Sequence, residues 1–177
     1  PNWSFDNIVA VGLRLGRDRW IEDFIKSYQE ILPEEVKENT FFYNMARLHV
    51  HRKDYDQAKL ALLQVEFNEL FLALNAKLLL LKSYYEQDEL EAAKALINSL
   101  KLFESRKSIM AYHRSNYTNY LKFVYQLCKF KSRMPWKDYS QKAAAIVSEI
   151  EQTKELIDRD WLLEKAKELA GVTGQSD

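Results

Sequence analysis

The residues that most often carry chemistry are few and widely separated in this chain. It holds three histidines and one cysteine among 177 residues. His49 and His51 are two positions apart, which on a helix directs them about 160° away from each other, so they do not suit a shared metal ion. We expect His49 to fill the core, and we expect Cys128, which lies on an apolar face, to be an inert buried thiol.

Acid–base and nucleophilic chemistry lack a recognisable arrangement as well. The carboxylates stand mostly beside lysines, whereas a catalytic pair needs burial between apolar walls. GLRLGRDR at 12–19 has two glycines, but their spacing does not form a phosphate-binding loop. His113 and Asn116 are three positions apart, where a structural hydrogen bond is the simpler interpretation. We therefore expect no enzyme activity, no metal and no cofactor.

The composition predicts an all-α protein. There are four glycines and three prolines, with no glycine between Gly16 and Gly171, so turn residues for a many-stranded sheet are missing. The longest apolar stretch, at 70–81, is too short and too polar to span a bilayer, and we expect no membrane insertion. A single cysteine fits a reducing compartment, so we expect a cytoplasmic location.

Apolar residues recur with helical spacing in segments of similar length. They predict helices at about 4–16, 18–32, 33–52, 54–65, 69–87 and 89–102. When these helices are taken in pairs, Phe24 aligns with Ala58 at a step of 34 residues and Ala58 with Ala93 at a step of 35. A period in this range indicates stacked helix pairs, because one pair alone cannot bury its apolar face.

The pattern changes in the last third of the chain. A long helix is expected at about 105–131, followed by a helix from about 135 and a last amphipathic helix around Trp161. No glycine or proline separates the last two, which could form one bent helix. We expect about seven or eight helices in one domain at 1–170, with three helix pairs at about 5–102, the long basic helix and C-terminal capping helices at 105–170, and a disordered tail at 171–177.

Two segments resemble tetratricopeptide (TPR) repeats. They are NMARLHVHRKDYDQAKLALLQV and LLKSYYEQDELEAAKALINSL. Each has a large residue three positions after the middle of its first helix, a short acidic turn, and an alanine in its second helix: His49, Asp54 and Ala58, then Tyr84, Glu89 and Ala93. The resemblance implies an α-solenoid of stacked helical hairpins, and the whole chain is also similar to bacterial TPR-like proteins.

The TPR resemblance further implies a binding surface. Such stacks present the first helix of each pair on a concave face, which here carries Tyr43, Arg47, His51, Lys82 and Tyr85. These residues would suit an extended peptide with an acidic or carboxylate end. Of the residues with which some TPR proteins clamp a carboxyl terminus, only Asn44 is present. We expect a non-catalytic protein-interaction or scaffold module, and an ordinary solvated face is the alternative.

Charge is segregated although the whole chain is neutral. Nine basic residues and one acid between Lys101 and Lys137 give +8, and the remaining 17 basic and 25 acidic residues give −8. On a helix, four cations form a basic ridge within a stripe about 80° wide: Lys107, Arg114, Lys122 and Lys129.

This basic ridge has three interpretations. It could bind nucleic acid or another polyanion, with affinity that falls as salt rises. It could face an acidic protein partner, or it could be neutralised within the fold by acids such as Glu149, Glu151, Glu155 and Asp158. A further alternative for the whole chain is a structural or oligomerisation domain of a larger protein, with self-association.

Overall fold

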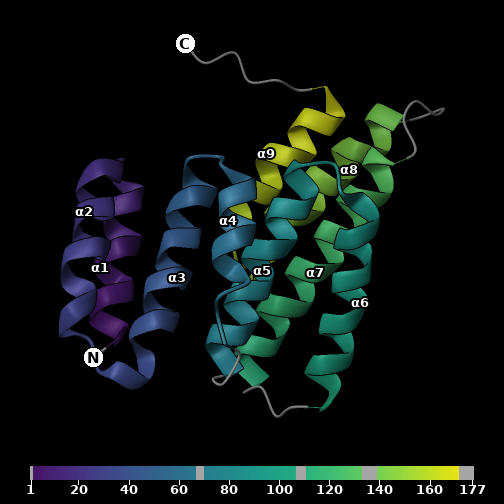
Figure 1. The fold of residues 1–177 in the computed structure, drawn as a ribbon. Helices are drawn as coiled ribbons and strands as arrows, with labels where there is room; N and C mark the ends of the chain where they lie inside the picture. The colour runs from purple at the N-terminus through teal and green to yellow at the C-terminus, as the bar shows by residue number, and fades with distance from the viewer. Residues whose placement is uncertain (1, 67–69, 107–110, 133–138, 172–177) are drawn as a thin grey trace. The chain divides into compact units, whose positions relative to one another are not determined.

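The computed structural model describes residues 2–66, 70–106, 111–132 and 139–171, and it is all-α as predicted, with no strand among these residues. Figure 1 shows the helices in order along the chain. They are α1 (Asn2–Arg14), α2 (Asp18–Tyr28), the 3-10 turn η1 (Gln29–Ile31), α3 (Glu34–His51), α4 (Tyr55–Leu62), α5 (Leu70–Glu86), α6 (Leu90–Arg106), α7 (Ala111–Lys131), α8 (Tyr139–Gln152) and α9 (Arg159–Ala170).

The chain divides into two compact units, residues 1–88 and 89–177. The first holds α1 to α5 and the second α6 to α9. The single domain expected over 1–170 stays a prediction. Of the disordered tail expected at 171–177, residues 172–177 lie outside the described residues. None of the described helices is both long and apolar enough to cross a lipid bilayer.

A left-handed residue ends α1, α3 and α5. Gly16, Lys53 and Asp88 have φ values of 64°, 60° and 61°. After Gly16, the amide of Arg17 donates back to the carbonyl of Gly12, and the amide of Asp54 donates in the same way to His49. This is the Schellman arrangement, which satisfies carbonyl groups at a helix end. Asp54 then caps α4 by accepting from the amide of Gln57 at 3.4 Å.

These turns correct the alignment of the first helix pair. Gly16 and Lys53 are 37 residues apart, and Lys53 and Asp88 are 35 apart. The step of 35 agrees with the sequence alignment, but the step of 34 between the first two pairs is three residues too short. With the step of 37, Ile21 takes the place of Ala58, and both are completely buried.

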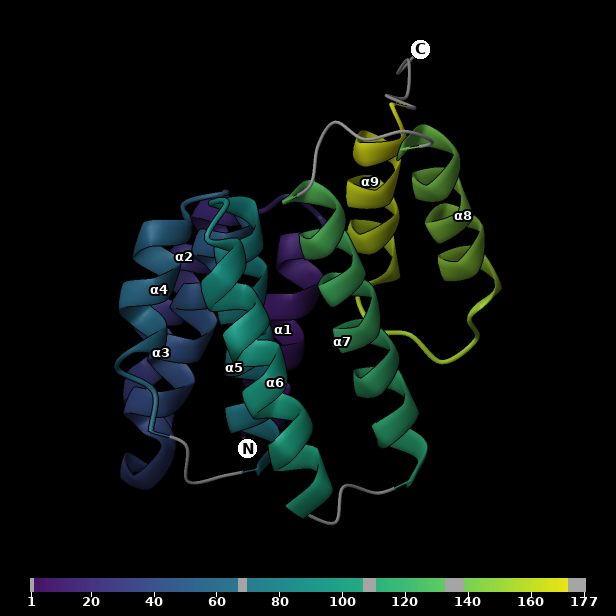
Figure 2. The ribbon, with the colours of Figure 1, turned by 90° about the vertical axis from the view of Figure 1, so that its right-hand side faces the viewer.

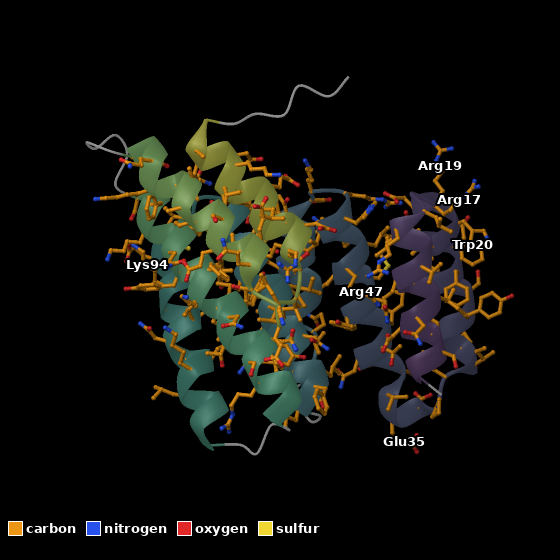
Figure 3. The ribbon with its side chains drawn as sticks, turned by 180° about the vertical axis from the view of Figure 1, so that it is seen from behind. Arg17, Arg19, Trp20, Glu35, Arg47 and Lys94 are labelled. Atoms are coloured by element: carbon orange, nitrogen blue, oxygen red, sulfur yellow. The ribbon has the colours of Figure 1, made fainter. Side chains whose placement is uncertain are left out.

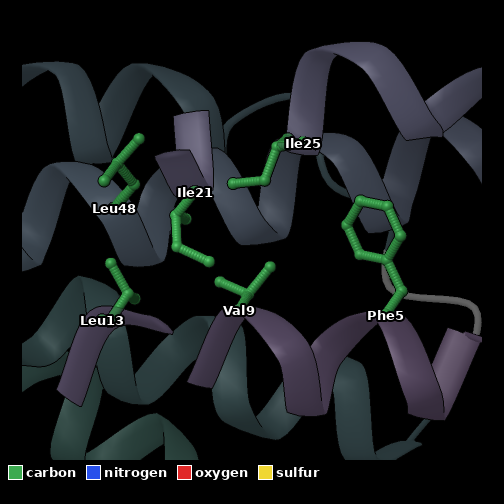
Figure 4. Packing of buried hydrophobic residues seen from close by; sticks show 6 residues of the cluster. All are labelled: Phe5, Val9, Leu13, Ile21, Ile25 and Leu48. Carbon is green, nitrogen blue, oxygen red and sulfur yellow. The ribbon is translucent and has the colours of Figure 1, made fainter. Parts of the chain in front are cut away.

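The core of the first pair lies between α1, α2 and α3. Figure 4 shows its buried side chains: Phe5, Val9, Leu13, Ile21, Ile25 and Leu48. Phe41 and Met45 of α3 cover the same cluster. A second cluster joins α3 and α4 to α5 through Ala46, Leu62, Val65 and Ala76. α3 therefore contributes side chains to both clusters, so packing on two of its sides holds it in place within the first unit.

The second unit is organised around α7. Buried side chains occupy one side of this helix, from Tyr117 to Cys128, as the predicted 3.6-residue period required. Tyr120 contacts Trp161 of α9, with ring centroids 6.1 Å apart. Figure 2 shows α8 and α9 side by side, joined by the segment at 153–158. They are two helices and not one bent helix, so the described chain has nine α-helices where the sequence indicated seven or eight.

Candidate functional site

A hollow in the first unit is lined by the first helices of the predicted pairs. Its volume is about 280 Å³, and α1, α3 and α5 all contribute to it. The lining residues are Asp6, Asn7, Ala10, Thr40, Tyr43, Arg47, Phe71, Leu72 and Asn75. A space of this size, with polar groups beside aromatic ones, can hold one or two side chains of a peptide.

Hydrogen bonds between α1 and α3 form the polar wall of the hollow. Asn44 is completely buried, and its Nδ2 donates to Oδ1 of Asp6 at 2.7 Å and to the carbonyl of Thr40 at 2.8 Å. Arg47 extends from α3 towards α1 (Figure 3), where its Nη1 donates to the carbonyl of Asp6 at 2.9 Å and to Oδ1 of Asn44 at 2.9 Å. Asn44 thus holds a carboxylate of the chain itself.

The remaining wall of the hollow is aromatic. The guanidinium carbon of Arg47 lies 5.7 Å from the ring centroid of Tyr43, within the range of a cation–π contact. Phe71 of α5 is an exposed large apolar side chain. Asp6 and Arg47 bring one negative and one positive charge to the same space. The hollow therefore combines a donor, an acceptor and apolar surface, which suits a peptide segment better than a strongly charged ligand.

The structure brings together two of the five predicted concave-face residues, Tyr43 and Arg47. His51 lies on the same side of α3 one turn later, but its Nδ1 is 3.3 Å from Asp18 of α2. Lys82 is partly exposed, and it follows Asn75 by seven residues, which places it on the same side of α5 two turns away.

The prediction that Tyr85 faces a partner is wrong. Its exposed fraction is 2%, so it belongs to the core. Buried residues of α5 from Ala73 to Tyr85 cover an arc of roughly 200° around the helix, wider than the single apolar stripe of a surface helix. A tyrosine at the edge of such an arc is enclosed even though the repeat pattern places it near the binding side.

Sequence reasoning missed Asp6 and Ala10 because of the alignment error in the first pair. A step of 37 residues places Asp6 over Tyr43 and Ala10 over Arg47, and both line the hollow. A step of 34 instead places Val9 over Tyr43 and Leu13 over Arg47, but Val9 and Leu13 are both buried in the core. The signal that could have found them was Gly16, whose left-handed turn marks the end of α1.

A charged cluster connects α2 to the end of α3. Arg52 approaches Glu22 at 2.7 Å and Asp18 at 3.6 Å, and Lys26 approaches Glu22 at 2.6 Å. Hydrogen bonds from Lys26 and then Arg52 lower the pKa of Glu22 from 4.5 to about 2. The ion pairs join α2 to the end of α3 within the first unit, where they stabilise the packing of these two helices.

A second, apolar groove of about 330 Å³ lies on α3 and α4. It is lined by Phe41, Phe42, Met45, His49, Gln57, Leu60, Ala61 and Gln64. Desolvation lowers the pKa of His49, while Asp54, whose carboxylate is 3.8 Å away, opposes this effect. The expectation of a core histidine is met in part, because His49 is neither exposed nor fully buried.

The basic ridge is partly neutralised within the second unit. Lys122 pairs with Glu149 of α8 at 2.5 Å, as expected if acids within the fold neutralise the ridge. Arg114 and Lys129 are exposed, and Lys107 lies outside the described residues. Lys101 of α6 sits 5.2 Å from the ring centroid of Tyr125, which ties another cation to α7. The ridge thus offers fewer unpaired charges than the sequence suggested.

Two further buried groups are structural. Burial raises the pKa of Cys128 to about 11, which agrees with an inert thiol. Lys165 is buried, but its Nζ pairs with Glu164 at 2.9 Å and with Glu168 at 3.0 Å. Within the described part of the chain, no group of three or more His, Cys, Asp or Glu residues could hold a metal ion.

Comparisons with known proteins add no relative: no family model, no curated protein and no solved structure matches the chain.

Proposed function

We propose that this chain is a non-catalytic, TPR-like helical-repeat module that binds a peptide or protein partner in the hollow between α1, α3 and α5. The observation that carries the proposal is the convergence of Tyr43 and Arg47 on a single space of about 280 Å³. These residues come from the helix that the TPR pattern assigns to a concave binding face, and residues of α1 and α5 complete the space.

The chemistry of the lining supports an extended peptide. Its backbone carries both an N–H donor and a carbonyl acceptor, and the hollow offers the carboxylate of Asp6 and the guanidinium of Arg47. An apolar side chain of the peptide would contact Tyr43 and Phe71. This ligand is less acidic than the one the sequence suggested, because Asp6 brings a negative charge beside Arg47.

Filling the hollow tests the proposal without removing a hydrogen bond. Ala10 lines the hollow from α1, and an Ala10→Met variant would occupy the space with a flexible side chain that suits a helix. Ala144→Met is the matched control, since Ala144 is exposed on α8 of the other unit. Circular dichroism of both variants verifies that they fold.

The measurement is a selection of peptides from a displayed random library, followed by titration of the best binder. We expect Ala10→Met to weaken binding by at least about tenfold, or about 1.4 kcal/mol, while Ala144→Met leaves it unchanged. Backbone amide NMR shifts on adding the peptide should cluster on α1, α3 and α5. Equal binding by Ala10→Met and the unchanged chain would rule out the hollow as the site.

A further inference from the structure

The α1–α2 pair, together with the η1 turn that follows it, has an exposed apolar surface. It carries Ile8, Val11 and Leu15 on α1, and Trp20, Tyr28 and Ile31 on α2 and η1. The exposed fractions of these six side chains run from 40% to 75%. We call this surface the outer face. Single exposed apolar residues are ordinary, but a contiguous group of this extent marks an interaction site.

Aromatic contacts make the outer face continuous. Trp20 stacks on Phe24 with centroids 5.5 Å apart, and Phe24 stacks on Tyr28 at 4.9 Å. Gly12 of α1 lies beside Trp20, since a Cβ at Gly12 would be 3.9 Å from that indole ring. The aromatic row on α2 therefore borders the aliphatic row on α1 and forms one patch with it.

Opposite charges stand at the two ends of the outer face. Arg17 and Arg19 are exposed at the start of α2, and Glu34 and Glu35 are exposed at the start of α3. Figure 3 shows Arg17 and Arg19 at one end of this helix pair, Glu35 at the other, and Trp20 on the outward side between them. Glu30, near the acidic end, is paired with Lys37 at 2.5 Å.

We propose that the outer face binds the outer face of a second copy of this chain, in an antiparallel arrangement about a two-fold axis. In such an interface the same patch meets itself, and a two-fold axis across the helices places the basic end of one copy against the acidic end of the other. The charge pattern of the outer face is thus complementary to the same pattern after rotation about the two-fold axis. Binding to an unrelated partner would not require this self-complementarity.

The size of the outer face fits this occupant. Its six side chains expose roughly 600–700 Å² per copy, close to the ~800 Å² that each partner contributes to a standard interface. The hollow stays open in the pair, because Asp6 and Ala10 lie roughly 100–180° around α1 from Ile8, Val11 and Leu15. The inference therefore does not depend on the proposed function, and a dimer would present two hollows to a bivalent partner.

The first experiment is sedimentation equilibrium of the chain over a hundredfold range of concentration. We expect a reversible monomer–dimer equilibrium with Kd of about 1–100 µM. Trp20→Ser combined with Tyr28→Ser should weaken dimerisation at least about tenfold, because it removes the centre of the patch. A chain that remains monomeric at every concentration, or a dimer unaffected by this variant, would overturn the proposal.

A charge exchange tests the antiparallel arrangement. One variant carries Arg17→Glu and Arg19→Glu, and the other carries Glu34→Lys and Glu35→Lys. Each should self-associate at least about tenfold more weakly, because like charges meet across the two-fold axis. An equimolar mixture should form a heterodimer as stable as the original dimer or more so, with an affinity that falls at high salt. A mixture that does not recover association would contradict this arrangement.

The control is Lys154→Glu combined with Lys167→Glu, two charge reversals at exposed positions of the second unit. It should dimerise like the unchanged chain. Thermal unfolding of each variant separates lost association from lost folding. The mixing experiment keeps its meaning even if Lys at the start of α3 lowers stability, since only a folded partner can restore the heterodimer.

Discussion

Gly12 of α1 and Ile21 of α2 share one space in the first helix pair. A Cβ at Gly12 would overlap Cδ1 and Cγ1 of Ile21, whose side chain is completely buried (Figure 4). At the positions 37 residues later the sizes are exchanged, with the large His49 and the small Ala58. The first two helix pairs therefore show different sequence patterns at these positions, although each places one large residue against one small residue.

Gly12→Ala should lower the free energy of unfolding, although alanine favours a helix. The overlap with Ile21 costs about 1–3 kcal/mol, and the gain in helix propensity is about 0.5–1 kcal/mol. In an Ile21→Ala background, which lacks both Cδ1 and Cγ1, the same change should cost less or become stabilising. Urea unfolding of the four proteins gives the coupling. Equal effects of Gly12→Ala in both backgrounds would show that the two residues do not share this space.

The exchange of sizes explains how far the sequence could predict this fold. The all-α class, most helix boundaries and the step of 35 residues followed from periodicity, because they depend on local spacing. A step of 34 places Gly12 over Ala46, a small residue over a small one, and this match misaligned the first pair. Packing requires complementary volumes, so Ile21 can stand where Ala58 stands if Gly12 makes room for it.

The same alignment error limited how much of the candidate site could be predicted from the sequence. Tyr43 and Arg47 followed from the repeat, and Asp6 and Ala10 were lost with the misalignment. Tyr85 shows a different obstacle, since burial around α5 depends on how many neighbours enclose a helix. That number is a property of the tertiary structure, and the residue types on one helix do not contain it.

Glu22→Gln should destabilise the folded chain in a pH-dependent way. The folded pKa of Glu22, about 2, lies below its ordinary value of 4.5, so the unfolded chain takes up the proton first as pH falls. The stabilisation is complete above about pH 4.5 and is lost as pH approaches 2. Because the pair is partly exposed, we expect only about 0.5–1 kcal/mol at neutral pH.

The measurement is urea unfolding of Glu22→Gln and the unchanged chain at several pH values. The difference in unfolding free energy should shrink towards zero between pH 4.5 and 2. Asp23→Asn, at an exposed position one residue away, is the control and should show little change. A difference that grows on acidification would contradict the assigned role of Lys26 and Arg52.

Arg159 joins the end of α8 to the start of α9. Its guanidinium donates to the carbonyls of Ile150, Glu151, Thr153 and Lys154. These hydrogen bonds satisfy carbonyl groups at and just after the end of α8, where no glycine is available to end the helix. Arg159→Ala should cost about 2–3 kcal/mol, because these carbonyls lose a charged donor. Thermal or urea unfolding measures the effect.

Arg159→Lys separates geometry from charge at this position. A lysine keeps the charge but cannot reach several carbonyls with a planar fork, so it should recover less than half of the loss. Lys167→Ala, an exposed position on α9, should change the unfolding free energy by no more than about 0.5 kcal/mol. Full recovery of the unfolding free energy with lysine would mean that positive charge near the helix end matters more than the planar geometry of the guanidinium.

Cys128 offers a probe of opening in the second unit. Its side chain is completely buried, and burial raises its pKa to about 11, so both access and thiolate formation are suppressed. A disulfide reagent such as Ellman's at about pH 8 should label the folded chain at least about a hundredfold more slowly than the chain in concentrated guanidinium chloride.

Labelling of Cys128 should depend on the stability of its surroundings. If reaction requires opening, Arg159→Ala should accelerate it, since α8 and α9 pack against α7 within the same unit. Gly12→Ala, in the first unit, should leave the rate unchanged unless the two units unfold together. Rapid labelling of the unchanged folded chain would show that Cys128 is accessible, and it would remove the assignment of an inert core thiol.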